Sequence, residues 1–217
     1  MKALITGGSR GIGKSIALYF ATKGIEVIIP TREELNLNDP SLIKSYISSL
    51  SSVNILINNA GVNNIQNIEE VEYNNLLETF NINFFSPYLL CSALLPKFKK
   101  QNYGRIINIS SIWSTNVKDK RSTYAASKSA IHSLTKQLIP ETKNYNILSN
   151  TISPGYISTD LTYQNNTPED INIIEQTIPL NRMGTPEEIA KLAYYLSVEN
   201  SYINGQEIII DGGFLCQ

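Results

Sequence analysis

A tyrosine and a lysine that are separated by three residues form the pair in this chain best suited to proton chemistry. Tyr124 and Lys128 fall at positions i and i+4 of a predicted helix, so their side chains share one face. A free phenol, with a pKa of about 10, is a poor acid or base near neutral pH. A neighbouring ammonium group favours the phenolate and lowers that pKa. We therefore expect Tyr124 to be able to donate a proton to an oxygen that gains negative charge.

A serine near this pair supplies a second polar group for the same chemistry. Ser111 precedes Tyr124 in the chain and comes just after a predicted strand. Its hydroxyl can donate a hydrogen bond to a substrate carbonyl and stabilise charge that develops there. Taken alone, the Tyr/Lys pair would be read as a surface pair and Ser110-Ser111 as a loop or a helix cap. We interpret Ser110 as structural and Ser111 as part of the candidate site.

A glycine-rich turn lies between the first predicted strand and the first predicted helix. Its sequence is Thr6-Gly7-Gly8-Ser9-Arg10-Gly11-Ile12-Gly13. Glycines let a backbone approach a pyrophosphate, and a helix N-terminus offers free N–H groups and the positive end of its dipole. The spacing is neither G-x-G-x-x-G nor that of a P-loop. The context still predicts a dinucleotide site beyond the carboxyl end of the first strand.

The elements that position these residues alternate along the chain. Short apolar runs predict strands at 3–6, 26–30, 53–57, 105–109, 147–152 and 207–210. Apolar spacing and capping signals predict helices at 11–23, 40–50, most of 71–100, 123–143 and 186–198. This alternation predicts an α/β fold, with one doubly wound parallel sheet that helices cover on both faces.

We expect one domain over residues 1–217, because no linker, repeat or low-complexity tract divides the chain. The least regular stretch, 156–182, is interpreted as a lid over the substrate. It carries Tyr163, Gln164, Asn165 and Asn166, so polar substrates suit it as well as apolar ones.

Composition excludes several classes of protein. The 18 Lys+Arg and 19 Asp+Glu leave a formal net charge of −1, which argues against a nucleic acid as the main partner. Two cysteines cannot form a disulfide framework, and one histidine cannot form a metal site by itself. The opening apolar run is too short for a signal peptide, and no run of about 18 apolar residues appears. We expect a cytoplasmic protein with no metal and no membrane contact.

Several segments, in the same order along almost the whole chain, resemble the short-chain dehydrogenase/reductase family. The glycine turn has the spacing T-G-x-x-x-G-x-G, and the Ser111, Tyr124 and Lys128 set also matches. The other matching segments are Asn58-Asn59-Ala60-Gly61, Pro154-Gly155-Tyr156-Ile157-Ser158-Thr159, residues 182–190, Gly205-Gln206 and Asp211-Gly212-Gly213. Within the family, the chain is most similar to the 3-oxoacyl-acyl-carrier-protein reductase type.

The resemblance implies a role for each matching residue. Tyr124 would be the acid/base, Lys128 would lower its pKa and hold the nicotinamide ribose, and Ser111 would orient and polarise the carbonyl. Asn83 matches the family's fourth residue, which supports a water and proton relay beside the lysine, and Asn81 is a rival for that position. The implied cofactor-binding residues are Thr6, Gly7, Ser9, Arg10, Gly11, Ile12, Gly13, Thr31, Arg32, Asn36, Leu37, Asn59, Ala60, Gly61, Tyr124, Lys128, Pro154, Gly155, Ile157 and Thr159.

The residues after the second strand favour NADP(H) over NAD(H). NAD-selective enzymes of this layout place an acid there to bind the ribose 2′-hydroxyl. Here Thr31 occupies that place, and Arg32 follows it. Together with Arg10, Arg32 offers two guanidinium groups to a 2′-phosphate. Glu33 and Glu34 come next and are close enough in sequence to oppose a phosphate.

The chain departs from the family pattern just after this point. The helix that usually follows the second strand is missing, and the third strand must be short, about 35–37. Asn36 stands where the family tends to carry Asp, although a carboxamide can still bind an amino group.

The function expected from these features is NADP(H)-dependent reduction of a ketone, 3-oxoacyl-like or another small carbonyl compound, to a secondary alcohol. One alternative is a sugar or hydroxy-acid dehydrogenase on the same scaffold. Another is a non-catalytic module that senses NADP. The resemblance also implies a homo-oligomer, a dimer or tetramer, formed through the helices before and at the Tyr/Lys segment and through the last strand.

Overall fold

The computed structural model describes residues 1–164 and 166–216, and these residues form a six-stranded sheet in the order β2-β1-β3-β4-β5-β6. Every neighbouring pair of strands is parallel. The strands are β1 (Lys2–Ile5), β2 (Glu26–Ile28), β3 (Ile55–Asn58), β4 (Gly104–Ile109), β5 (Ile147–Pro154) and β6 (Glu207–Ile210). The predicted doubly wound parallel α/β fold is confirmed.

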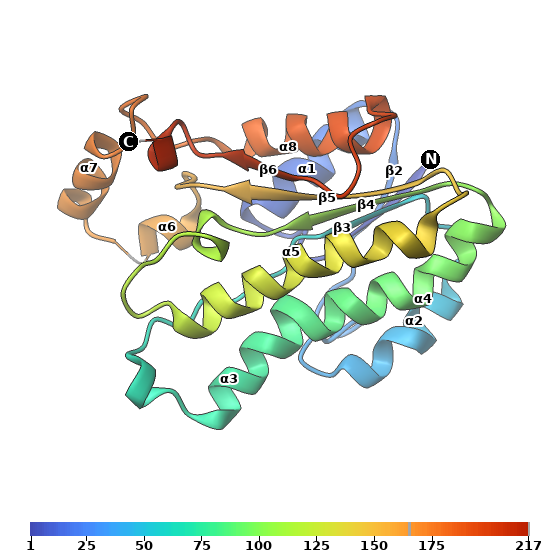
Figure 1. The fold of residues 1–217 in the computed structure, drawn as a ribbon, viewed down its shortest axis with the longest axis horizontal. Helices are drawn as coiled ribbons and strands as arrows, with labels where there is room; N and C mark the ends of the chain where they lie inside the picture. The colour runs from blue at the N-terminus through green and yellow to red at the C-terminus, as the bar shows by residue number, and fades with distance from the viewer. Residues whose placement is uncertain (165, 217) are drawn as a thin grey trace.

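Helices cover both faces of this sheet (Figure 1). Helices α1 (Gly11–Thr22) and α8 (Pro186–Tyr194) lie on one face, and α2 (Ile43–Ser49), α4 (Ser86–Lys100) and α5 (Ser122–Thr142) lie on the other. Successive side chains of a strand point to opposite faces. Ala3 and Ile5 therefore pack with Phe20 under α1, whereas Leu4 packs with Leu94 of α4. The two apolar layers fix the sheet between its helices.

The remaining elements are short. They are α3 (Tyr73–Phe80), α6 (Asp160–Gln164), α7 (Pro168–Gln176), the 3-10 turns Pro40–Leu42, Ile68–Glu70, Ile112–Ser114 and Phe214–Cys216, and the π-helical turns Asn81–Phe85 and Tyr195–Glu199. Among the helices of the described ranges, none combines the length and the apolar character that a membrane crossing requires.

The segment between β2 and α2 carries no strand, so the expected short strand at 35–37 is wrong. Its polar groups bond locally instead: the N–H of Asn38 donates to Asn36 Oδ1 at 3.1 Å, and the N–H of Asp39 donates to the Asn36 carbonyl at 2.9 Å. Such local bonds offer the backbone an alternative to a ladder. The crossover helix after β2 is absent, as the sequence predicted, and β2 becomes the edge of the sheet.

The segment 156–182 is more regular than expected, because it contains α6 and α7. A capping box at Thr167 and Asp170, with Pro168 at the first helical position, begins α7. Both helices lie beyond the carboxyl ends of β5 and β6 (Figure 1). Asn165, one of the polar residues expected in the lid, lies outside the described residues.

Candidate active site

The glycine turn is held against the end of β3 by side-chain hydrogen bonds. Thr6 Oγ1 accepts the N–H groups of Asn59 and Ala60, both at 3.1 Å. Asn59 Nδ2 donates to the carbonyls of Thr6 at 3.0 Å and Gly7 at 3.1 Å. Two segments far apart in the sequence thus form one edge of the site.

Two glycines of this turn have no room for a side chain. Gly7 has φ +64°, and a Cβ on it would lie 2.9 Å from Ala60 Cα. A Cβ on Gly13 would overlap the Gly7 carbonyl oxygen and Asn59 Nδ2. The glycines therefore allow α1 to begin directly against the turn. Arg10 precedes α1 without a side-chain cap, which leaves N–H groups of the first turn free for an anion.

A cavity of about 630 Å³ opens at the carboxyl edge of the sheet. Its volume lies in the range of small-molecule and cofactor sites. Ser111, Tyr124 and Lys128 line it together with residues of the glycine turn. Of the predicted cofactor residues, the wall includes Thr6, Gly7, Ser9, Arg10, Gly11, Ile12, Thr31, Arg32, Asn36, Leu37, Asn59, Ala60, Gly61, Pro154, Gly155, Ile157 and Thr159. Gly13 lies beneath the turn instead, buried in α1.

Ser111, Tyr124 and Lys128 converge on this wall from β4 and α5. Ser111 caps the 3-10 turn Ile112–Ser114, and its hydroxyl is hydrogen-bonded with Tyr124. Lys128 Nζ lies 5.7 Å from the centroid of the Tyr124 ring and donates to the Ile109 carbonyl at 2.8 Å. Ser110 Oγ donates to the backbone carbonyl of Lys128 at 3.0 Å, which ties α5 to the end of β4.

The electrostatics of the pair differ from the expectation. Burial raises the pKa of the Tyr124 phenol, and the hydrogen bond from Ser111 and the charge of Arg121 only partly oppose that rise. Burial also lowers the pKa of Lys128 to about 8. The expected lowering of the phenol pKa is therefore wrong, because the loss of solvent around the phenol outweighs the nearby positive charge.

Asn83 and Asn81 lie in the same π-helical turn but contact different parts of the molecule. Asn83 Oδ1 accepts the N–H of Val62, and its Nδ2 donates to the Val62 carbonyl and to Ser127 Oγ, each at 2.9 Å. A Cβ on Gly61 would lie 3.4 Å from both Asn83 Oδ1 and Lys128 Nζ, so these two polar groups converge. Asn81 Nδ2 instead donates to Asn38, at 3.1 Å to both its carbonyl and its Oδ1.

The far end of the cavity presents two arginines to an anion. Arg10 and Arg32 are exposed, line the cavity, and form no ion pair with any described acid. Glu34 is turned to its own segment, where its carboxylate accepts the N–H of Thr31 at 2.8 Å. The free first turn of α1, the close backbone at the glycines and this pair of cations fit a phosphorylated dinucleotide.

Three aromatic rings form a cluster, and two of them, Trp113 and Tyr156, line the cavity. Trp113, Tyr156 and Phe214 pack edge to face, with centroids 5.5 to 6.0 Å apart. Lys118 Nζ donates to the Tyr156 hydroxyl at 2.7 Å. Trp113 both lines the cavity and packs against Tyr156.

Sequence reasoning missed Arg121 and Glu207. Arg121 lies at the start of α5, three residues before Tyr124, and lines the cavity. Glu207 accepts hydrogen bonds from Ser114 at 3.0 Å and Ser153 at 2.5 Å and lies 3.5 Å from His132 Nε2, so it holds the turn after Ser111 against β5 and α5. Two features of the sequence could have pointed to them. Arg121 is a charged residue at the start of a predicted helix, and Glu207 is an acidic residue at the start of an apolar strand.

Within the ranges that the structure describes, no three His, Cys, Asp or Glu side chains gather as metal ligands.

Comparison with known proteins places the chain among oxidoreductases. The family model described as enoyl-(acyl carrier protein) reductase matches residues 34–215. The 3-oxoacyl-acyl-carrier-protein reductase FabG of Vibrio cholerae is 33% identical over 237 residues, covering 97% of this chain and 96% of its own. Two solved structures superpose over 100% of this chain and 99% of theirs: 4-hydroxyisoleucine dehydrogenase complexed with NADH (TM-score 0.92, 27% identity) and ElxO with NADP bound (TM-score 0.91, 26% identity).

Proposed function

This chain belongs to the short-chain dehydrogenase/reductase family, and from that premise we propose that it reduces the ketone of a small carbonyl substrate to a secondary alcohol with NADP(H). As a member, it is an NAD(P)-dependent oxidoreductase that acts on CH–OH and C=O groups. The finer proposal concerns the direction, the cofactor and the residues that act.

The reduction adds a hydride to the ketone carbon and a proton to its oxygen. The reduced nicotinamide, when bound, supplies the hydride and leaves as its oxidised form. Ser111 donates a hydrogen bond to the carbonyl oxygen and so stabilises the negative charge that develops there. Tyr124 then transfers its phenolic proton to that oxygen. The raised pKa of Tyr124 keeps the phenol protonated at neutral pH but also makes it a weaker acid, so the transfer requires that the phenolate it leaves be stabilised.

Lys128 and Asn83 assist the proton donor Tyr124, the first by its charge and the second by positioning α5. The Lys128 ammonium lies beside the Tyr124 ring and can stabilise the phenolate that remains after transfer. Asn83 fixes Ser127, one residue before Lys128, and so holds this side of α5. The observation that carries the proposal is that Ser111, Tyr124 and Lys128 line one cavity together with the glycine turn.

The test is the rate of NADPH oxidation with a panel of small ketones. We expect Tyr124→Phe to lower kcat by about 10²- to 10⁴-fold, the usual contribution of a positioned general acid, with NADPH affinity almost unchanged. Tyr145→Phe, at an exposed tyrosine, is the matched control and should keep the wild-type rate. Equal rates in wild type and Tyr124→Phe would overturn the assignment. NADPH binding without reduction of any ketone would favour a non-catalytic sensor.

The choice of NADP(H) is supported by Arg10 and Arg32, which are free to bind a 2′-phosphate bidentately. We expect NADP to raise the melting temperature more than NAD at equal concentration. Arg32→Gln should weaken NADP binding by about 10- to 100-fold, since a charge-assisted hydrogen bond contributes roughly 1.5–3 kcal/mol, and leave NAD binding unchanged. Greater stabilisation by NAD would refute the preference.

A further inference from the structure

Arg121 occupies the substrate end of the cavity rather than the cofactor end. It directly precedes α5, so it lies one helical turn before Tyr124, and it lines the same wall as Ser111 and Tyr156. Three residues of helix rise by about 4.5 Å. The two residues therefore start about one helical turn apart, and both line the same cavity.

The Arg121 guanidinium has no polar partner among the described residues. Its Nε is shielded from solvent and unpaired, and neither terminal nitrogen takes part in a hydrogen bond or ion pair there. Burial lowers the pKa of Arg121, and the groups that oppose this are the phenols of Tyr124 and Tyr156. A half-buried cation without a counter-charge is unfavourable, and an anion bound beside it removes that cost.

Two arginines outside the cavity, Arg105 and Arg182, have polar partners. Arg182 pairs with both oxygens of Glu188. Arg105 also has an unpaired Nε, but its terminal nitrogens donate to the carbonyls of Gly104 and Asn146 and to Asn146 Oδ1. Arg121 differs from these two because it lines the cavity and its side chain has no polar partner among the described residues.

The surroundings of Arg121 favour an anion over a cation or a neutral group. Lys118 lies over the rings of Trp113 and Tyr156, at 5.3 and 5.0 Å from their centroids, and adds positive charge to this wall. Among the described residues that line the cavity, Asp160 is the one that carries a carboxylate, and it forms no ion pair with Arg121.

Resting on the proposed reduction, we infer that the substrate is a short oxo acid whose carboxylate is bound by Arg121 while its ketone faces Ser111 and Tyr124. The carboxylate accepts two parallel N–H bonds from the guanidinium and takes no part in the bonds that form or break. The product is the corresponding hydroxy acid. Arg121 thus determines specificity, whereas the proton transfer stays with Tyr124.

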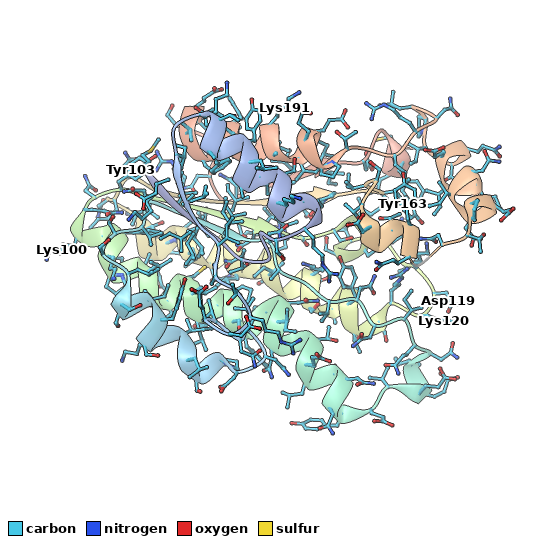
Figure 2. The ribbon with its side chains drawn as sticks, turned by 180° about the vertical axis from the view of Figure 1, so that it is seen from behind. Lys100, Tyr103, Asp119, Lys120, Tyr163 and Lys191 are labelled. Atoms are coloured by element: carbon cyan, nitrogen blue, oxygen red, sulfur yellow. The ribbon has the colours of Figure 1, made fainter. Side chains whose placement is uncertain are left out.

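The experiment compares short 2-oxo and 3-oxo acids with their primary amides, which keep the ketone and remove the charge. For each pair, kcat/KM is measured with wild type, Arg121→Gln, Arg121→Lys and Lys120→Gln. The last variant is the matched control, because it removes one positive charge at the adjacent exposed residue, which does not line this cavity. Figure 2 shows Lys120 beside Asp119 at the outer rim of the molecule.

We expect wild type to prefer each acid over its amide, and Arg121→Gln to lower that preference by about 10- to 100-fold, mainly through KM. Those factors correspond to a charge-assisted hydrogen bond. Arg121→Lys should retain part of the preference, and Lys120→Gln all of it. NADP-induced stabilisation of each variant verifies that its fold and cofactor site are intact.

Two outcomes overturn the inference while leaving the proposed reduction intact. One is a wild type that reduces amides, or a neutral 3-oxoacyl thioester, as well as it reduces the acids. The other is an Arg121→Gln variant in which acid and amide lose activity equally. Failure of wild type to reduce any ketone would instead contradict the proposed function itself.

Discussion

At the residue scale, the surroundings of Tyr124 keep its proton in place until a substrate needs it. Burial raises the pKa of the phenol, and the Ser111 hydroxyl bonded to it is also the group positioned to polarise a carbonyl. Lys128 is buried with its ammonium bonded to the Ile109 carbonyl, and this burial brings its pKa to about 8. The lysine is therefore the group of this site that titrates nearest to neutral pH.

This pKa predicts a fall in activity at alkaline pH. Below pH 8 the Lys128 side chain is a charged ammonium, and above pH 8 it is a neutral amine. The neutral amine binds a ribose and stabilises a phenolate less well than the ammonium does. For the free enzyme, reported by kcat/KM for NADPH, we expect a flat profile from pH 6 to about 7.5 and a decline through about pH 8. Steady-state rates with saturating ketone test this. A profile that stays flat or rises to pH 9.5 would contradict the prediction.

At the element scale, the π-helical turn Asn81–Phe85 decides which asparagine faces the site. It joins α3 to α4, and Pro87 in the first turn of α4 has no N–H to offer the carbonyl four residues before it. Such turns widen a helix locally and often occur at functional sites. Asn83 is thereby directed at Val62 and Ser127, whereas Asn81 is directed at Asn38.

The two asparagines should give different defects when each is changed to alanine. Asn83→Ala leaves the Val62 N–H unpaired, so we expect a loss of about 1–3 kcal/mol in the free energy of unfolding and at least a tenfold lower kcat. Asn81→Ala loosens the Asn38 segment of the cofactor wall, so we expect mainly a higher KM for NADPH. Urea unfolding and steady-state kinetics measure both. The reverse pattern would assign the relay position to Asn81.

At the scale of the whole molecule, α3 and α4 leave large apolar side chains uncovered. Tyr73 is 73% exposed, Tyr88 is 50%, and Phe85, Leu77 and Leu89 are between 37% and 40%. Contiguous exposed apolar surface usually marks an interaction site. It lies on the helices before the Tyr/Lys segment, where the resemblance implies contacts between copies of the chain.

We predict that this surface holds a homo-oligomer together. Tyr88→Glu places a charge in it and should shift the protein toward the monomer, as light scattering across a concentration series would show. Lys100→Gln makes the same change in net charge on the same helix, at a residue that points outward in Figure 2, and should leave the assembly intact. A wild type that is monomeric at every concentration would refute the prediction.

The local sequence pattern was sufficient to predict the fold of this protein and its candidate reactive groups. The alternation of apolar runs with helical spacing predicted the parallel sheet, because strand and helix periods are properties of neighbouring residues. The same locality placed Tyr124 and Lys128 on one face of a helix. The glycine spacing required a close backbone, and Gly7 and Gly13 have no room for a side chain.

Only the tertiary structure decided how these groups behave. The segment 35–37 forms no strand, and the Asn36 side chain accepts the N–H of Asn38 there instead. Burial rather than Lys128 sets the direction of the Tyr124 pKa shift. Arg121 has an unpaired Nε, whereas Glu207 contacts Ser114, Ser153 and His132. Both results depend on residues that come together from distant parts of the chain. Burial and non-local contact arise when the chain is packed, so no spacing along the sequence contains them.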